Sequence, residues 1–328
     1  MKYSKFPRSG EPISRLGFGA MGFAGWFGED TEDNFIAALH RALELGINFV
    51  DTARQYGQSE RIVGLALRRW TGRKPFVATK VQALGPNSQW QFPVEVETAF
   101  PPGHITADCE RSLRELGLDQ LDLLQLHIYW PTWGTSGYWM DELQELKRRG
   151  KVRFVGISAP DHRSDMVLGL VESGLIDSVQ TILNIFDPLA LDNLVPICAK
   201  RGVAVIARSV LDEGGLTGLL TSDTRFEEND FRHNYFDRVV PREVYLRKVD
   251  SLRLYVPAHA SSLASLALRF VLANSRVTTA IVSMQVEAYA EMNIAALDEP
   301  ELPAELVHRL RTRHRFIKNF NRVQEWED

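Results

Sequence analysis

Short runs of apolar and β-branched residues alternate along the chain with longer stretches in which apolar residues recur at helical spacing. The short runs that qualify as strands lie at 16–20, 47–51, 75–80, 121–126, 152–158, 177–180, 203–208 and 278–283. Strands that alternate with amphipathic helices are typical of units that build a parallel sheet. The pattern therefore predicts an α/β fold.

The stretches between these runs carry signals of helix ends. Three expected helices, at 31–45, 59–70 and 106–116, are followed within two residues by a glycine, which commonly ends a helix. Further helices are expected at about 139–149, 163–173, 190–200, 259–273 and 286–297. Eight strand and helix pairs predict a closed (β/α)₈ TIM barrel. No linker or change of composition divides the chain, so residues 1–328 are expected to form a single domain.

Two connections are much longer than the usual two to six residues. They cover 81–103 and 210–241, and both follow a predicted strand. In a barrel of this kind the segments after the strands gather at the carboxyl-terminal face, where active sites are built. We therefore expect both connections near the active site.

Composition narrows the classes of partner. The net charge is −4 and no basic run is present, which argues against a nucleic-acid partner and against an anionic membrane surface. No apolar run approaches the roughly 20 residues that span a bilayer, and the first residues lack the apolar stretch of a signal peptide. We expect a cytoplasmic protein. No heptad pattern or apolar stripe specifies an oligomer, so the oligomeric state stays open with a monomer as the default.

The two cysteines, Cys109 and Cys198, lie in apolar stretches without the spacing of a metal site. They are expected to be buried thiols, and no metal site is predicted.

Three glycines, Gly17, Gly19 and Gly22, match the G-x-G-x-x-G pattern of a dinucleotide-binding turn. That turn requires a helix to open at the glycines and an acidic residue about 20 positions later at a strand end. Neither requirement is met, because helical periodicity starts only near residue 31. We interpret the glycines as a tight strand end that allows close approach of the backbone.

Polar residues with catalytic potential follow three of the predicted strands. Asp51 ends the second strand, Lys80 the third, and His127 follows the fourth, while Tyr56 lies just beyond Asp51. Each has an ordinary structural role open to it, as a helix cap, an ion-pair partner or a core residue. Together, at one barrel mouth, they could deliver a proton near neutral pH. We expect Lys80 to lower the pKa of Tyr56 and Asp51 to hold Lys80 in place.

Several segments resemble the aldo-keto reductases. DTARQYGQSE, VATKV and LLQLHIY are similar to the three signature segments of that family in order and spacing. LGFGAMG, VRFVGIS and LDEGGLTGLL resemble its first strand, its nicotinamide-binding serine segment and its pyrophosphate loop. The resemblance spans the whole chain. It implies an NAD(P)(H)-dependent oxidoreductase in which Tyr56 is the general acid and base, Lys80 and Asp51 tune it, and His127 orients the carbonyl.

The resemblance also implies a set of cofactor contacts. Ser158 and Gln180 would bind the nicotinamide carboxamide, and Asn293 the adenine. The full set of cofactor-binding candidates is Gly19, Ala20, Met21, Asp51, Ser158, Gln180, Arg208, Ser209, Leu211, Gly215, Ser283, Met284, Gln285, Tyr289 and Asn293. From the residues alone, Gln180 could equally end a strand and Ser158 could cap a helix.

The chain departs from the family pattern at three places. Ala159 stands where an asparagine or histidine is usual, and Arg208 where an aromatic ring commonly stacks on the nicotinamide. A guanidinium can stack as well, but its charge disfavours the oxidised ring. The segment from Ser283 to Tyr289 has no Lys or Arg to bind the 2′-phosphate of NADP. NADP is the family default, and NAD is an equal alternative.

The resemblance implies a small carbonyl compound or alcohol as the substrate, without specifying its identity. Beside Tyr56 and His127, the candidate substrate residues are aromatic side chains that the predicted mouth carries, namely Trp26, Trp90, Tyr129 and Trp130. The same rings could instead pack their own loops. Arg54 could bind an anionic group, although a salt bridge with Glu60 is favoured.

Two functions other than carbonyl reduction or alcohol oxidation stay open on this barrel. One is a nicotinamide-binding regulatory subunit, and the other is a redox-silent lyase or isomerase that reuses Tyr56 and Lys80.

Overall fold

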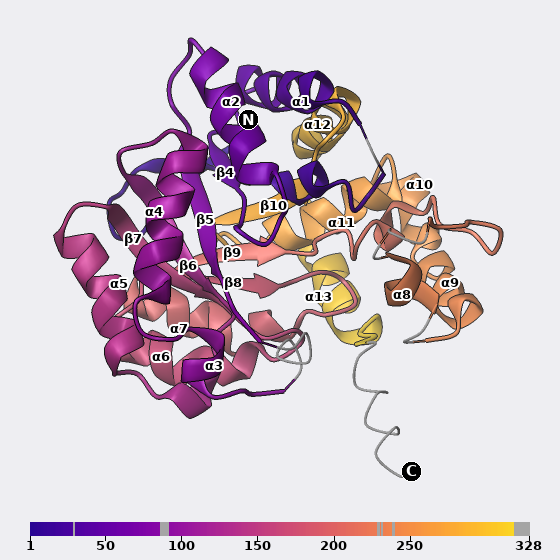
Figure 1. Ribbon diagram of the computed structural model, residues 1–328. Helices are drawn as coiled ribbons and strands as arrows, with labels where there is room; N and C mark the ends of the chain where they lie inside the picture. Colours follow the sequence, from indigo (N-terminus) through magenta and orange to yellow (C-terminus); the bar gives the residue numbers. More distant parts are fainter. Residues whose placement is uncertain (29, 86–91, 228–229, 231, 238–239, 318–328) are drawn as a thin grey trace.

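The computed structural model describes residues 1–28, 30–85, 92–227, 230, 232–237 and 240–317. Eight parallel strands close into a barrel in the order β10-β3-β4-β5-β6-β7-β8-β9 (Figure 1). They are β3 (Leu16–Gly19), β4 (Phe49–Asp51), β5 (Phe76–Gln82), β6 (Leu121–His127), β7 (Val152–Ser158), β8 (Ser178–Ile182), β9 (Ala204–Arg208) and β10 (Thr279–Ser283). Each overlaps one of the eight runs found in the sequence, so the barrel prediction is confirmed.

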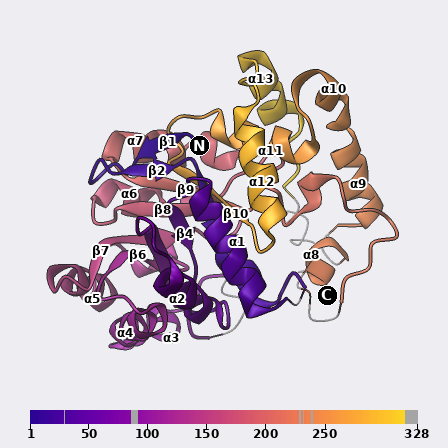
Figure 2. The same cartoon turned by 90° about the horizontal axis from the view of Figure 1, so that it is seen from above.

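The expected helices alternate with these strands and cover the outside of the barrel (Figures 1 and 2). They are α1 (Glu32–Glu44), α2 (Ser59–Arg69), α4 (His104–Leu116), α5 (Tyr138–Arg148), α6 (Leu168–Ser173), α7 (Leu194–Arg201), α11 (Leu263–Leu272) and α12 (Glu287–Ala295). Three of them, α6, α7 and α11, begin four or five residues later than expected. The hydroxyl of Ser262 accepts from the backbone N–H of Ser265 and so fixes the start of α11.

Other elements were not predicted. An antiparallel hairpin of β1 (Tyr3–Lys5) and β2 (Pro12–Ser14) precedes the barrel. Five further helices are α3 (Val96–Ala99), α8 (Arg232–Asp237), α9 (Arg242–Asp250), α10 (Val256–His259) and α13 (Ala304–Arg313). Of these, α8 lies within the long connection after β9 and α9 follows it, and both lie at one edge of the barrel in both views (Figures 1 and 2).

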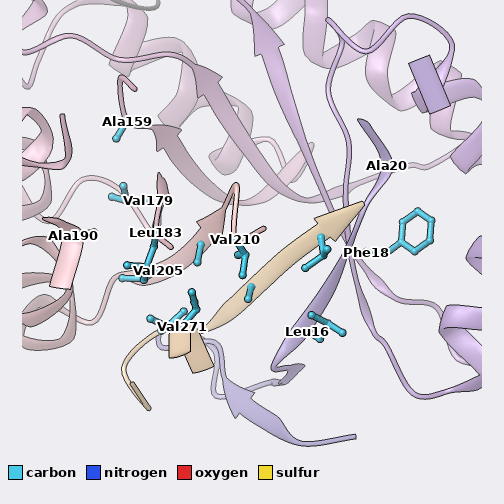
Figure 3. Packing of buried hydrophobic residues seen from close by; sticks show 14 of the residues in the cluster. Leu16, Phe18, Ala20, Ala159, Val179, Leu183, Ala190, Val205, Val210 and Val271 are labelled. Carbon is cyan, nitrogen blue, oxygen red and sulfur yellow. The ribbon is translucent and has the colours of Figure 1, made fainter. Parts of the chain in front are cut away.

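The core has two parts. The larger cluster lies between the strands and the surrounding helices, and Figure 3 shows members such as Leu16, Phe18, Val179 and Val205. The smaller one joins Phe6 and Ile13 of the hairpin segment to strand residues such as Phe49, Phe76 and Ile206. Burial of these large side chains contributes the main stabilising free energy of the barrel.

Side chains alternate between the two faces of each barrel strand. Phe49 and Asp51 share one face of β4, and Phe76, Ala78 and Lys80 share one face of β5. The apolar members of these two strands belong to the smaller cluster. The smaller cluster thus lies below the polar mouth.

The glycine segment after β3 opens no α-helix. A short 3₁₀ helix (Ala20–Ala24) follows Gly19 instead. The methyl group of an alanine at Gly17 would meet side chains of Ile281 and Phe49 at 3.0 Å, so this glycine serves packing. Among the described residues, no helix is long and apolar enough to cross a membrane.

Candidate active site

Four polar side chains meet at the mouth of the barrel, as the sequence predicted. Asp51, Lys80, His127 and Tyr56 are each at most 9% exposed. The Lys80 Nζ donates to Asp51 Oδ1 at 2.5 Å and to the carbonyl oxygen of Thr52 at 2.9 Å. The same Nζ lies 5.0 Å from the ring centroid of Tyr56. The rings of Tyr56 and His127 are perpendicular, with centroids 5.9 Å apart.

The expected direction of the Tyr56 pKa shift was wrong. Burial raises the pKa of Tyr56 above its ordinary value, although the Lys80 charge acts in the opposite direction as expected. The carboxylate of Asp51 adds to the rise because it disfavours a second negative charge nearby. Tyr56 is therefore a protonated phenol at neutral pH, which is the form that can donate a proton.

The pKa values of Lys80 and His127 are shifted in opposite directions. Burial disfavours the Lys80 ammonium, but the charge of Asp51 raises the pKa of Lys80 above its ordinary value. Burial and the positive charges of Lys80 and Arg208 hold the pKa of His127 well below its ordinary value. Lys80 is thus a fixed cation, and His127 is a neutral imidazole with one N–H to donate.

Gln180 makes a contact that sequence reasoning did not predict. Its Nε2 donates to Asp51 Oδ2 at 2.8 Å, so Lys80 and Gln180 each bind one oxygen of the same carboxylate. The contact spans the barrel from β8 to β4. Local periodicity carries no signal for a partner this far away in sequence.

Ser158, which was expected to bind the carboxamide, has a buried hydroxyl that the described protein leaves unsatisfied. It ends β7, is fully buried, and its Oγ has no hydrogen-bond partner among the described residues. A buried hydroxyl without a partner is unfavourable unless a ligand or water completes it. The alternative role as a helix cap is not what the structure has, since Ser158 lies within the strand and bonds no helix N–H.

Arg208 ends β9 and bridges to the segment after β7. Its Nη2 donates to Asp161 Oδ1 at 2.6 Å and to the carbonyl oxygen of Ala159 at 3.2 Å. The guanidinium therefore lies beside the residue that follows Ser158.

The connection after β9 has unusual backbone geometry. Ser209, Asp212 and Glu213 have φ values of 51°, 50° and 56°, in the left-handed region. Asp212 accepts a hydrogen bond from Tyr245 at 2.7 Å. A Cβ on Gly215 would lie 2.0 Å from the Tyr245 hydroxyl oxygen, so only glycine permits this contact. Leu211 lies half-buried in the same turn.

The segment expected to bind the adenosine half lies at the end of β10 and along α12. Met284 and Asn293 are buried, whereas Tyr289 is 43% exposed. Gln285 covers Gly22, because a Cβ on that glycine would lie 2.9 Å from its side chain. Gly19 packs against the backbone of Val282. The predicted neighbours Ser283, Ala20 and Met21 lie at the same strand ends.

The aromatic substrate candidates separate into two groups. Trp26 lies perpendicular to the Tyr56 ring with centroids 5.9 Å apart, so it can wall a pocket at the proton donor. Tyr129 donates to the carbonyl oxygen of Gly134 at 3.0 Å and packs within its own loop. Trp130 is 3% exposed, and Trp90 lies outside the described residues.

Arg54 forms an ion pair with the buried Glu60, as favoured from the sequence. No described group of three or more His, Cys, Asp or Glu side chains is arranged to hold a metal ion.

The model of the aldo/keto reductase family matches residues 15–313, which is most of the chain. The chain belongs to this family. An NADH-specific methylglyoxal reductase of Escherichia coli (strain K12) is 28% identical over 304 residues, which cover 87% of this chain and 90% of that protein. An L-galactose dehydrogenase of Arabidopsis thaliana is 29% identical over 305 residues, covering 89% of this chain and 87% of the relative.

Solved structures agree. A glycerol dehydrogenase of Gluconobacter oxydans superposes with a TM-score of 0.76 at 29% identity, covering 95% of each chain. The holo form of an aldo-keto reductase of Bacillus halodurans superposes with a TM-score of 0.72 at 26% identity and the same coverage. This aldo-keto reductase is therefore an oxidoreductase built on the family's barrel.

Proposed function

We propose that this aldo-keto reductase reduces a small aldehyde or ketone with NADH, and that Tyr56 supplies the proton. The observation that carries the proposal is the buried arrangement of a protonated phenol, a fixed ammonium and a neutral imidazole at one barrel mouth. These are the groups needed to hold a carbonyl oxygen and protonate it as negative charge develops there.

Each of the four residues has a separate task in this mechanism. His127 donates its N–H to the substrate oxygen and fixes the direction of approach. Tyr56 donates its phenolic proton to the same oxygen. The Lys80 charge then stabilises the tyrosinate that forms, and Asp51 keeps Lys80 in position through the 2.5 Å hydrogen bond. NADH, when bound, supplies the hydride that completes the reduction.

The raised pKa of Tyr56 sets the pH dependence. The phenol stays protonated through neutral pH, so kcat/KM for reduction should be flat there and fall only in the alkaline range. Alcohol oxidation needs the tyrosinate as a base, so its rate should rise as the pH is increased.

The residues at the other strand ends fit the cofactor. The buried Ser158 Oγ has no protein partner in the described structure and would bind the carboxamide. Gln180 is held to Asp51 and would contact the carboxamide from that fixed position.

The preference for NADH over NADPH rests on charge. The segment 283–289 holds no cation, and Glu287 places a negative charge in the first turn of α12. Without a cation, the 2′-phosphate of NADPH gains no ion pair there and meets a carboxylate. A relative of this chain is named as NADH-specific, and this agrees with a preference for NADH.

The test is to titrate the purified protein with NADH and with NADPH while following protein fluorescence. Oxidation of the bound cofactor is then measured with a panel of small aldehydes that starts from methylglyoxal. We expect tighter binding of NADH and aldehyde-dependent oxidation. Binding of neither cofactor would overturn the proposal, and tight binding without any aldehyde turnover would support a regulatory role instead.

A further inference from the structure

Arg208 is held at the mouth by two contacts on one side of its guanidinium. Both use Nη2, which donates to Asp161 and to the carbonyl oxygen of Ala159. The side chain is 16% exposed. Its Nε is buried and has no hydrogen-bond partner among the described residues. The cation is therefore fixed in place, but the described protein residues do not use all of its N–H donors.

The charge of Arg208 is permanent, because a guanidinium is not deprotonated in proteins. Its partner Asp161 is more open to solvent, with its side chain 30% exposed. Water therefore screens the carboxylate more effectively than the guanidinium. The pair leaves a net positive field on its buried side.

That field reaches the reacting groups. The charge of Arg208 acts to lower the pKa of Tyr56 and of His127, although burial leaves the pKa of Tyr56 raised overall. Ala159, to which Arg208 is bound, directly follows Ser158 with its buried hydroxyl. Arg208 thus acts electrostatically on the proton donor and is bonded to the neighbour of the residue proposed to bind the nicotinamide carboxamide.

We propose that Arg208 makes the enzyme hold NADH more tightly than NAD⁺, so that it takes up the reduced cofactor in preference to the oxidised one. This inference rests on the proposed function. Loss of hydride adds one positive charge to the nicotinamide ring, and a fixed cation nearby disfavours that form relative to the neutral reduced ring. Weaker binding of the oxidised cofactor also favours its release after reduction.

A second use of the same cation is to bind an anionic group of the substrate. The two uses differ in what they change. A substrate-binding arginine alters KM for anionic substrates and leaves the two cofactor affinities in their original ratio. A redox-biasing arginine alters the ratio of the dissociation constants for NAD⁺ and NADH without any substrate present.

The experiment measures both dissociation constants by quenching of tryptophan fluorescence, for the wild type and four variants. In Arg208→Gln the ratio of Kd for NAD⁺ to Kd for NADH should fall about tenfold, equivalent to about 1.4 kcal/mol. In Asp161→Asn the ratio should rise, because the guanidinium loses its counter-charge. Arg208→Lys should keep most of the wild-type ratio.

The fourth variant, Arg163→Gln, is the matched control. Arg163 lies on the same loop as Asp161, is 41% exposed and pairs with Asp165. Its removal should leave the ratio of the two dissociation constants unchanged. Opposite shifts in Arg208→Gln and Asp161→Asn cannot arise from a common loss of structure.

The outcomes separate the two proposals. If the wild type binds neither cofactor, the proposed function fails. If it binds both and the ratio is the same in Arg208→Gln and Asp161→Asn as in the wild type, the proposed function stands and the role of Arg208 is refuted.

Discussion

The two halves of the barrel mouth differ in how their polar atoms are satisfied. In the half built after β4, β5 and β6, Lys80 and Asp51 bind each other in full burial. In the half built after β7 to β10, the Ser158 hydroxyl is buried without a described partner, and Arg208 is engaged on one side only. The ion pair of the first half is complete as it stands. The second half has capacity for a ligand.

The halves also differ in how closely they follow the family pattern. From the sequence, the tetrad of Asp51, Tyr56, Lys80 and His127 resembles that pattern, whereas Ala159, Arg208 and Gln285 were interpreted as departures from it. Proton transfer needs one geometry, but a cofactor can be bound with more than one set of contacts. Gln180 links the halves through its bond to Asp51.

The largest effect is expected in the half of the mouth built after β4, β5 and β6, which carries the catalytic tetrad. Lys80→Met removes the fixed cation and should lower kcat about 10³-fold while leaving NADH affinity unchanged. Because the variant leaves the buried Asp51 carboxylate without its cation, it should also lose about 3–5 kcal/mol of stability. Thermal unfolding monitors this loss.

A double variant separates chemistry from folding. Asp51→Asn combined with Lys80→Met leaves no unpaired charge and should recover much of the stability. Its kcat should stay as low as that of the single variant. Recovery of activity together with stability would show that Lys80 serves only the fold.

In the cofactor half, Gln285→Arg should raise kcat/KM for NADPH relative to NADH about tenfold, since a charge-assisted hydrogen bond contributes roughly 1.5–3 kcal/mol. Gln285→Met is the control, because it removes the amide without adding a charge. If the ratio of kcat/KM for NADPH to kcat/KM for NADH is unchanged in the arginine variant, the 2′-phosphate does not bind beside residue 285.

The smallest effect is expected for Ser158→Ala. Loss of one hydrogen bond of about 1 kcal/mol should weaken NADH binding roughly fivefold. Ser112 offers a matched control, because its hydroxyl on α4 is also buried without a described partner. Ser112→Ala should leave NADH affinity as it is, and equal losses in both variants would argue against a carboxamide contact.

Much of this arrangement could be predicted from the sequence, because strand ends in a barrel share one face. That rule placed Asp51, Lys80 and His127 together from local periodicity alone. The hairpin of β1 and β2 was missed, since its three-residue strands are too short to give a period, and only the folded barrel provides the interior into which Phe6 packs.

The net pKa shift of Tyr56 could not be predicted for a related reason. The neighbouring charges were foreseen, but the extent of burial, which dominates the shift, is a property of the packed mouth. The pairing of Arg208 with Asp161 was missed as well, because it joins segments 47 residues apart.

The central claim is that Tyr56 donates the proton while the other half of the mouth holds NADH. It is tested most directly by single-turnover kinetics with Tyr56→Phe preloaded with NADH and mixed with an aldehyde that the wild type reduces. We expect the dissociation constant for NADH to match the wild type and the rate of NADH oxidation to fall at least about 10³-fold. An undiminished rate in this variant, with NADH bound as tightly as in the wild type, would contradict the assignment.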